Sequence, residues 1–295
     1  MFQVDQPAGA RVGWPCAEPQ FGLNMDRYEH ARLVGPLCAA WITLFSAYFF
    51  WNARDPGTPG ASWIAAMREG TSGLIQTFKE AKRYRELLKF LIAHMLYADG
   101  MAALLALIAV YYSLFLGWDV LVLIIYAIYA SIFAFAGGLI GGWLDNTFGV
   151  KRALLMEIFL MVLSFGIQLS ITQESLLFGA IENSKVWDSI VFETLSDLTM
   201  LALVSLVAIS VTASISSSRS MLVTLAPPGR SGEFFGLYAI AGTITVWMGP
   251  LLVETFTLWF NDQRAGIASI NLLFAVGVTV LLSVKVDRKA KASHQ

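Results

Sequence analysis

Long apolar stretches recur along the sequence and constrain its fold more than any other feature. Seven of them reach the length of about 20 residues that a helix needs to cross the hydrocarbon core of a bilayer. They cover 31–51, 88–116, 120–143, 153–172, 190–215, 235–260 and 265–284. Only 14% of the residues are Asp, Glu, Lys or Arg, against about 25% in a soluble domain. The sequence therefore predicts an all-α membrane protein with about seven transmembrane helices.

The distribution of basic residues predicts the orientation of these helices. If the end of the first helix faces the cytoplasm, 15 of the 20 Lys and Arg residues fall in cytoplasmic segments. Cytoplasmic loops of membrane proteins carry this excess of positive charge. We therefore expect the C-terminus in the cytoplasm.

The same pattern predicts five consecutive segments. They are an irregular N-terminal segment (1–30), one transmembrane helix (31–51), a cytoplasmic linker (52–87), a six-helix bundle (88–284) and a cytoplasmic tail (285–295). Apolar and basic residues alternate in the linker at near-helical spacing, which is typical of an amphipathic helix on a membrane surface. A plain connection between two parts of the chain is the alternative.

A polar interruption, SRSMLVTLAPPGRSGEFFGLY at Ser218–Tyr238, separates two of the apolar stretches. Two prolines cannot continue a helix, and the following glycine permits a sharp turn. A glutamate in the first turn of the next helix suits the helix dipole. We expect a cytoplasmic hairpin whose characteristic residues are Arg219, Pro227, Pro228, Gly229, Arg230 and Glu233.

Three runs of sequence resemble one branch of the major facilitator superfamily. They are KRYRELLKFLIAHMLYADG, GGLIGGWLDNTFGVKRALL and SRSMLVTLAPPGRSGEFFGLYAIAGTITVWMGPLL. In this order and spacing they are similar to the C-terminal half of the bacterial relatives of the vacuole effluxer, an autophagy-related amino-acid permease. The resemblance implies a six-helix C-terminal bundle preceded by a helix that resembles helix six. It also implies a bacterial inner membrane and an absent N-terminal half.

The second of these runs resembles the inner-loop signature of the superfamily and departs from it at two positions. The signature carries Asp and Arg where this chain has Asn146 and Thr147, while Asp145 stands beside them. We expect any charge relay of this loop to differ accordingly. The residues of this loop motif in the chain are Gly142, Asp145, Asn146, Gly149, Lys151 and Arg152.

Asp99 is the main candidate for the path of a solute or proton. It follows Lys89 by ten residues, so that it lies roughly 15 Å into the bilayer. A carboxylate at that depth is costly and suggests a function. It could bind a substrate amine or take up a proton, with His94 and Tyr97 as neighbours, or each of the three could serve packing alone.

Gly249 and Pro250 predict a helix kink.

Secondary transport of a small solute, with amino-acid efflux implied by the resemblance, is the expected function. The alternative is a half transporter without transport of its own that acts as a membrane assembly partner. We expect no enzyme, catalytic residue, metal site or cofactor, because the three histidines form no ligand motif and no phosphate-binding glycine loop occurs. A net charge of −1 argues against nucleic acid. Expected partners are the lipid bilayer, a small-molecule substrate, and a missing N-terminal half or second copy.

Overall fold

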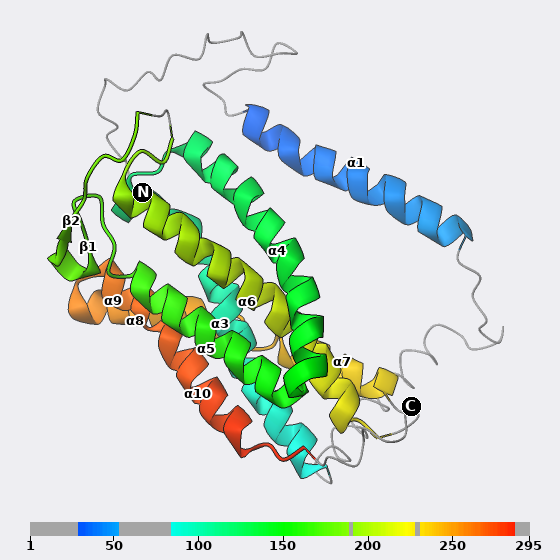
Figure 1. Ribbon diagram of the computed structural model, residues 1–295. Coiled ribbons are helices and arrows are strands. Elements are labelled where there is room, and N and C mark those ends of the chain that lie inside the picture. The colour runs from blue at the N-terminus through cyan, green and yellow to red at the C-terminus, as the bar shows by residue number, and fades with distance from the viewer. Residues whose placement is uncertain (1–28, 53–83, 189–190, 228–230, 287–295) are drawn as a thin grey trace. The chain divides into compact units, whose positions relative to one another are not determined.

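The computed structural model describes residues 29–52, 84–188, 191–227 and 231–286 (Figure 1). The chain divides into two compact units, Met1–Trp63 and Ile64–Gln295, and each is considered by itself. The predicted linker lies largely at 53–83, outside the described residues, as does most of the N-terminal segment. Helices dominate the described residues, which confirms the all-α class.

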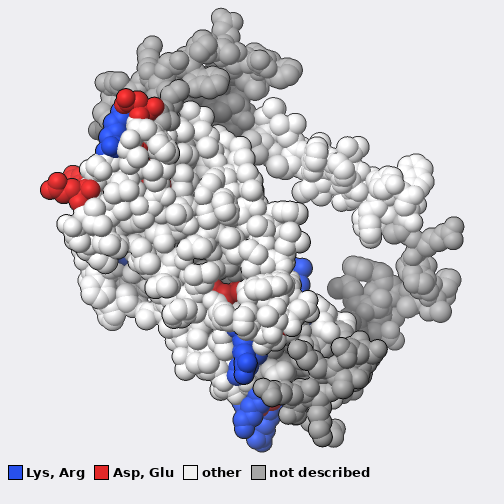
Figure 2. Space-filling model, viewed as in Figure 1, with Lys and Arg blue, Asp and Glu red and all other residues white. Residues whose placement is uncertain are grey.

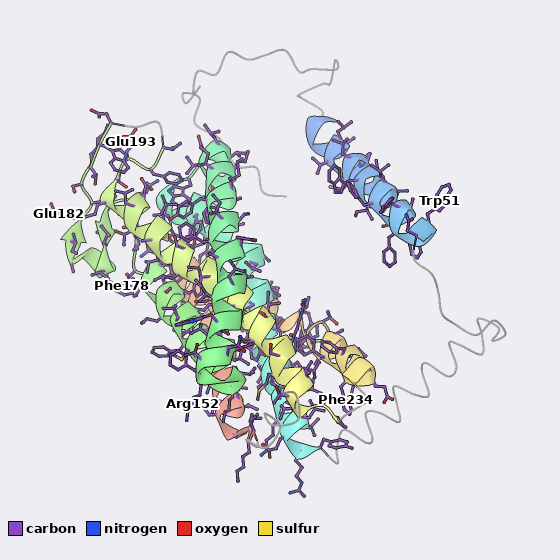
Figure 3. All side chains as sticks on the ribbon, turned by 45° about the vertical axis from the view of Figure 1, so that its right-hand side comes forward. Trp51, Arg152, Phe178, Glu182, Glu193 and Phe234 are labelled. Carbon is purple, nitrogen blue, oxygen red and sulfur yellow. The ribbon has the colours of Figure 1, made fainter. Side chains whose placement is uncertain are left out.

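The described part of the first unit is a single helix, α1 (Glu29–Asn52). Apolar side chains are exposed all along it, including Leu37, Trp41 and Tyr48, and Trp51 at its end is 90% exposed (Figure 3). A helix that is apolar on every side requires apolar surroundings. The helix predicted at 31–51 is therefore present, and its surface suits lipid.

The second unit contains the remaining helices and a small hairpin. The helices are α3 (Arg85–Leu116), α4 (Val120–Phe148), α5 (Val150–Gln168), α6 (Leu195–Leu225), α7 (Ser231–Ala241), α8 (Met248–Phe260), α9 (Gln263–Ala268) and α10 (Ile270–Ser283). The strands β1 (Ser175–Leu176) and β2 (Ile181–Glu182) pair antiparallel, with Ser175 opposite Glu182. The short 3₁₀ helix η1 (Leu177–Gly179) connects them.

Among the described residues, five helices are long and apolar enough to cross a membrane. They span Arg32–Asn52, Arg85–Leu116, Val120–Phe148, Leu195–Leu225 and Gln263–Ser283. The other two predicted crossings are also helical, but α5 has only 19 residues with charges at both its start and its middle, and α7 and α8 are separated by a break. The number of crossings remains a prediction.

The helices of the second unit run between two ends (Figure 1). One end, called the hairpin end below, holds β1, β2 and the start of α6. The opposite end, called the α4–α5 end, holds Gly149 and the end of α10. Phe178 and Glu182 lie at the hairpin end, whereas Arg152 and Phe234 lie at the α4–α5 end (Figure 3). The face in Figure 2 carries few charged residues between these ends. This separation of charge suits a bundle immersed in lipid.

Small residues bring α4 and α6 close together. A Cβ atom added at Gly137 would lie 2.5 Å from the carbonyl oxygen of Ile209, and one at Gly141 would lie 2.9 Å from Cα of Ala213. Gly142 faces open space instead. Association of helices in membranes depends on such close approach, so Gly137 and Gly141 position α6 against α4.

Helix α6 is longer than the sequence predicts. It continues to Leu225, ten residues past the predicted end at 215, so Arg219 lies in the helix and not in a loop. The prediction was wrong because it ended the helix at the cluster of serines. Nothing in 216–225 breaks a helix, and the first proline comes only at Pro227. Residues 228–230, with Pro228, Gly229 and Arg230, lie outside the described residues, and Glu233 lies in the first turn of α7 as predicted.

Charged side chains at the hairpin end are exposed and pair with one another. Lys185 forms ion pairs with Asp188 at 2.8 Å and with Glu193 at 3.0 Å. Hydrogen bonds to these two carboxylates raise the pKa of Lys185. Exposed pairs of this kind stabilise a fold only weakly, so this cluster marks an aqueous surface.

Candidate functional site

Asp99 lies near the middle of α3 and is only 1% exposed. The backbone N–H of Gly249, on α8, faces its carboxyl group. Neither carboxyl oxygen makes a hydrogen bond of good geometry with any described residue. Buried polar groups are normally hydrogen-bonded, so Asp99 stands out as a polar group whose bonding is unsatisfied in this conformation.

His94 and Tyr97 lie on the same helix, five and two residues before Asp99. The ring of His94 stacks on Tyr238 of α7, with centroids 3.9 Å apart. The hydroxyls of Tyr97 and Ser218, on α6, lie 2.8 Å apart. His94 and Tyr97 also contact each other, with ring centroids at 5.2 Å. The three predicted residues are thus buried together, and each meets a different helix.

A break between α7 and α8 lies beside these residues. A Cβ atom at Gly242 would lie 3.0 Å from Nε2 of His94, and one at Gly249 would lie 2.5 Å from Cβ of Ala103 and 3.3 Å from the carbonyl oxygen of Asp99. The chain is irregular from 242 to 247, and Pro250 lies in the first turn of α8. The helix is therefore interrupted before Gly249 and Pro250, where a proline at a helix start is readily accepted.

Irregular backbone within a membrane is tolerated where protein buries it or where it lines a cavity. Here it adjoins a carboxyl group and an imidazole whose Nδ1 also lacks a described partner. The hydroxyl of Thr245, within the break, is buried and unpartnered as well. The carboxyl group and the imidazole can hold a proton or an amine, since each retains free donor or acceptor capacity.

Sequence reasoning did not find Tyr238 or Ser218 as neighbours of this site. Tyr238 and Ser218 belong to the quoted interruption, but no periodicity relates them to α3. Pairing between helices far apart in sequence depends on the tertiary fold, and a single sequence does not contain that information.

An apolar hollow among the described residues lies elsewhere in the unit. It has a volume of about 340 Å³ and an apolar lining drawn from α3, α4 and α6. Its walls include Leu104, Tyr126 and Val207 but none of the three predicted site residues. Asp99 is therefore enclosed by helices in this conformation and does not face that hollow.

The predicted loop residues of the second unit gather at the α4–α5 end. Gly142, Asp145 and Asn146 lie in the last two turns of α4, and Gly149 joins α4 to α5 with a φ of 85°. Such a φ favours glycine. Lys151 hydrogen-bonds to the end of α10, and Arg152 is exposed.

Comparison with known proteins agrees with this architecture. The chain is 27% identical over 223 residues to the uncharacterized MFS-type transporter YxiO of Bacillus subtilis, covering 75% of this chain and 46% of the relative. It is 24% identical over 287 residues to autophagy-related protein 22-1 of Aspergillus fumigatus, covering 92% and 45%. It is 22% identical over 258 residues to autophagy-related protein 22-1 of Aspergillus niger, covering 84% and 40%. The chain spans less than half the length of these relatives.

The apolar helices and these similarities identify an integral, multi-pass membrane protein. The family described as vacuole effluxer Atg22 like matches residues 21–294, which is nearly the whole sequence. The chain therefore belongs to the family of vacuole effluxer Atg22-like proteins.

Proposed function

We propose that this chain takes part in secondary transport of a small solute, with outward movement of amino acids as the specific activity. The observation that carries the proposal is the buried carboxyl group of Asp99 beside the break between α7 and α8. The comparisons support membrane transport as the class of function, because one relative is called an MFS-type transporter and the family is described as vacuole effluxer Atg22 like.

In this proposal Asp99 binds the amino group of the solute or a coupled proton. An isolated carboxylate is costly inside a membrane, and a positive partner removes most of that cost. An ammonium group or a proton would satisfy the oxygens that lack a described partner. Since Asp99 is enclosed, α7 and α8 must move to admit a solute, and the break at 242–247 provides the hinge.

His94 and Tyr97 accompany Asp99 in the proposed pathway. His94 is held by stacking on Tyr238, and Tyr97 is held by its contact with Ser218. Movement of α7 would separate His94 from Tyr238 and expose an imidazole that can carry a proton. These residues would then connect Asp99 with the α4–α5 end of the bundle.

The proposal includes a second bundle. Alternating access moves one bundle against another around a shared site, and the second unit supplies one bundle. A separate chain or a second copy would supply the other. The proposed location is the bacterial inner membrane, with the α4–α5 end and the C-terminus in the cytoplasm.

Reconstitution tests the function directly. The full chain is placed in liposomes loaded with a panel of labelled amino acids, and solute release is followed with and without a proton gradient. We expect faster release than from protein-free liposomes for at least one amino acid, with a rate that depends on the gradient. If no amino acid is released faster than from protein-free liposomes, from protein shown to be helical and monodisperse, the result would contradict transport by copies of this chain alone and favour the role of an assembly partner.

A further inference from the structure

A second buried carboxyl group, Glu157, lies on α5 outside the site described above. Its side chain is 3% exposed and sits where α5 packs against α6. The hydroxyl of Ser217, on α6, donates a hydrogen bond of 2.9 Å to Oε1 of Glu157. The bond joins the two helices through polar side chains inside an otherwise apolar contact.

The other oxygen of Glu157 is unsatisfied. Oε2 is buried and has no hydrogen-bond partner among the described residues. The described ion pairs do not include Glu157 either, and Lys151 on the same helix is occupied by carbonyl groups of α10. A buried charge normally has a partner, so the carboxylate form lacks the neutralising group that it would need.

Among the groups on the packed helices, a carboxyl group opposes a charge at Glu157, whereas the hydrogen bond from Ser217 favours it. From α4 the carboxyl group of Asp145 acts on it, and Oδ1 of Asp145 is itself buried without a described partner. From α6 the hydroxyl of Ser217 donates to it. From α3 the hydroxyl of Tyr97 interacts with it electrostatically, and α10 contains no titratable residue. A neighbouring like charge disfavours the carboxylate form, so Asp145 and burial together favour the protonated form of Glu157.

We propose that Glu157 is a proton-binding site that links the protonation of α5 to its packing against α6. With the proton bound, the neutral acid keeps its bond from Ser217 and fits the apolar contact. On release of the proton to water at the α4–α5 end, a carboxylate forms beside Asp145. Repulsion and the cost of burial then favour separation of α5 from α6.

The site has a direct connection to the candidate transport site. Ser217 is followed by Ser218, whose hydroxyl contacts Tyr97 on α3, and Tyr97 precedes Asp99 by two residues. If the proposed transport function holds, protonation of Glu157 would bias the helix that carries Asp99. The proton site itself does not depend on that function.

Infrared titration of the purified full chain in detergent tests the proposal. A protonated carboxyl group gives its own carbonyl band, and a glutamine at the same place does not. We expect the wild-type chain to show such a band at neutral pH, Glu157→Gln to lose part of it, and proton release on alkalinisation to fall by one per chain. Glu182→Gln, which changes an exposed carboxyl group of β2, should leave the band and the proton count at neutral pH unchanged.

Two results would overturn the proposal. One is an unchanged band and proton count in Glu157→Gln, since Asp99 would then account for the signal. The other is loss of the wild-type band on adding sodium at constant pH, which would assign the site to a metal cation. If Glu157→Gln does not fold, Ser217→Ala serves instead, because losing the bond to Oε1 must shift the midpoint of the band. An unshifted midpoint would count against the site.

None of these measurements needs a solute or a gradient. Failure of transport in liposomes would therefore leave the infrared result intact. Failure of the infrared result would leave the transport measurement intact.

Discussion

The side-chain nitrogen of Lys151 lies 2.6 Å from the carbonyl oxygen of Val284 and 2.9 Å from that of Leu282. The first turn of α5 thereby holds the last turn of α10, whose final carbonyl groups have no partner within their own helix. A cation at that position also interacts favourably with the helix dipole. Lys151, singled out in the sequence as part of a loop motif, thus has a structural task at the α4–α5 end.

Replacement of Lys151 should loosen the end of α10. We expect Lys151→Met to lower stability by about 1 kcal/mol, since the bonds are partly exposed to solvent. Thermal unfolding in detergent, followed by the helical circular dichroism signal, measures the change. The matched control is Arg152→Met, because the side chain of Arg152 is exposed and forms no hydrogen bond or ion pair with the described residues. Equal shifts of the unfolding temperature in both variants would contradict a stabilising role for the hydrogen bonds from Lys151 to α10.

The contact between α4 and α6 predicts opposite effects at two adjacent glycines. Alanine at Gly137 places its Cβ 2.5 Å from the carbonyl oxygen of Ile209, so the helices must separate. Overpacking of this kind costs about 1–3 kcal/mol. Alanine at Gly138 meets only a methyl group of Thr212 at 3.9 Å, and its higher helix propensity should leave stability unchanged or raised. Unfolding temperatures of the two variants provide the comparison, and a smaller loss for Gly137→Ala than for Gly138→Ala would refute the close contact.

A hydrogen bond at the hairpin end predicts a third effect. Nε1 of Trp118 donates to Oδ1 of Asp197 at 2.7 Å, and Asp197 also completes a capping box with Thr194 at the start of α6. Trp118→Phe keeps an aromatic ring but leaves that oxygen without its donor, which should cost about 1–2 kcal/mol.

The control for this variant is Trp187→Phe, since Trp187 is half exposed at the same end. Circular dichroism suits the measurement because both variants lose a fluorescent residue. If Trp187→Phe lowers the unfolding temperature as much as Trp118→Phe does, the bond to Asp197 contributes nothing of its own.

The positions of the helices follow from the sequence more closely than their ends do. Hydropathy placed a helical segment at every described crossing, and the acidic Glu233 marked the start of α7. Hydropathy did not show that α6 reaches Leu225, because serines and one arginine lower the hydropathy of 216–225 without breaking the helix. It also gave no sign of the hairpin at 175–182, whose strands have only two residues each.

For the candidate site, the sequence indicated the central residue but not the residues that contact it. Depth within an apolar run was enough to single out Asp99, since a charge there is costly whatever surrounds it. The partners of Glu157 and His94 are residues 60 and 144 positions away along the chain, Ser217 and Tyr238. Only the packing of the helices brings these pairs together, so no spacing in the sequence could indicate them.

The central claim is that the buried carboxyl group of Asp99 acts in transport. Asp99→Asn keeps the size of the side chain but can neither take up a proton nor attract an amine as a carboxylate does. The matched control is Asp119→Asn, because Asp119 caps α4 by accepting from the N–H of Val122 at 2.9 Å, and asparagine caps helices equally well.

Solute release from liposomes, measured for both variants at equal amounts of folded protein, gives the most direct test. We predict that Asp99→Asn reduces the rate at least about tenfold, the effect of losing roughly 1.4 kcal/mol of stabilisation in the rate-limiting step, whereas Asp119→Asn retains the wild-type rate. A wild-type rate in Asp99→Asn would remove Asp99 from the mechanism and contradict the account.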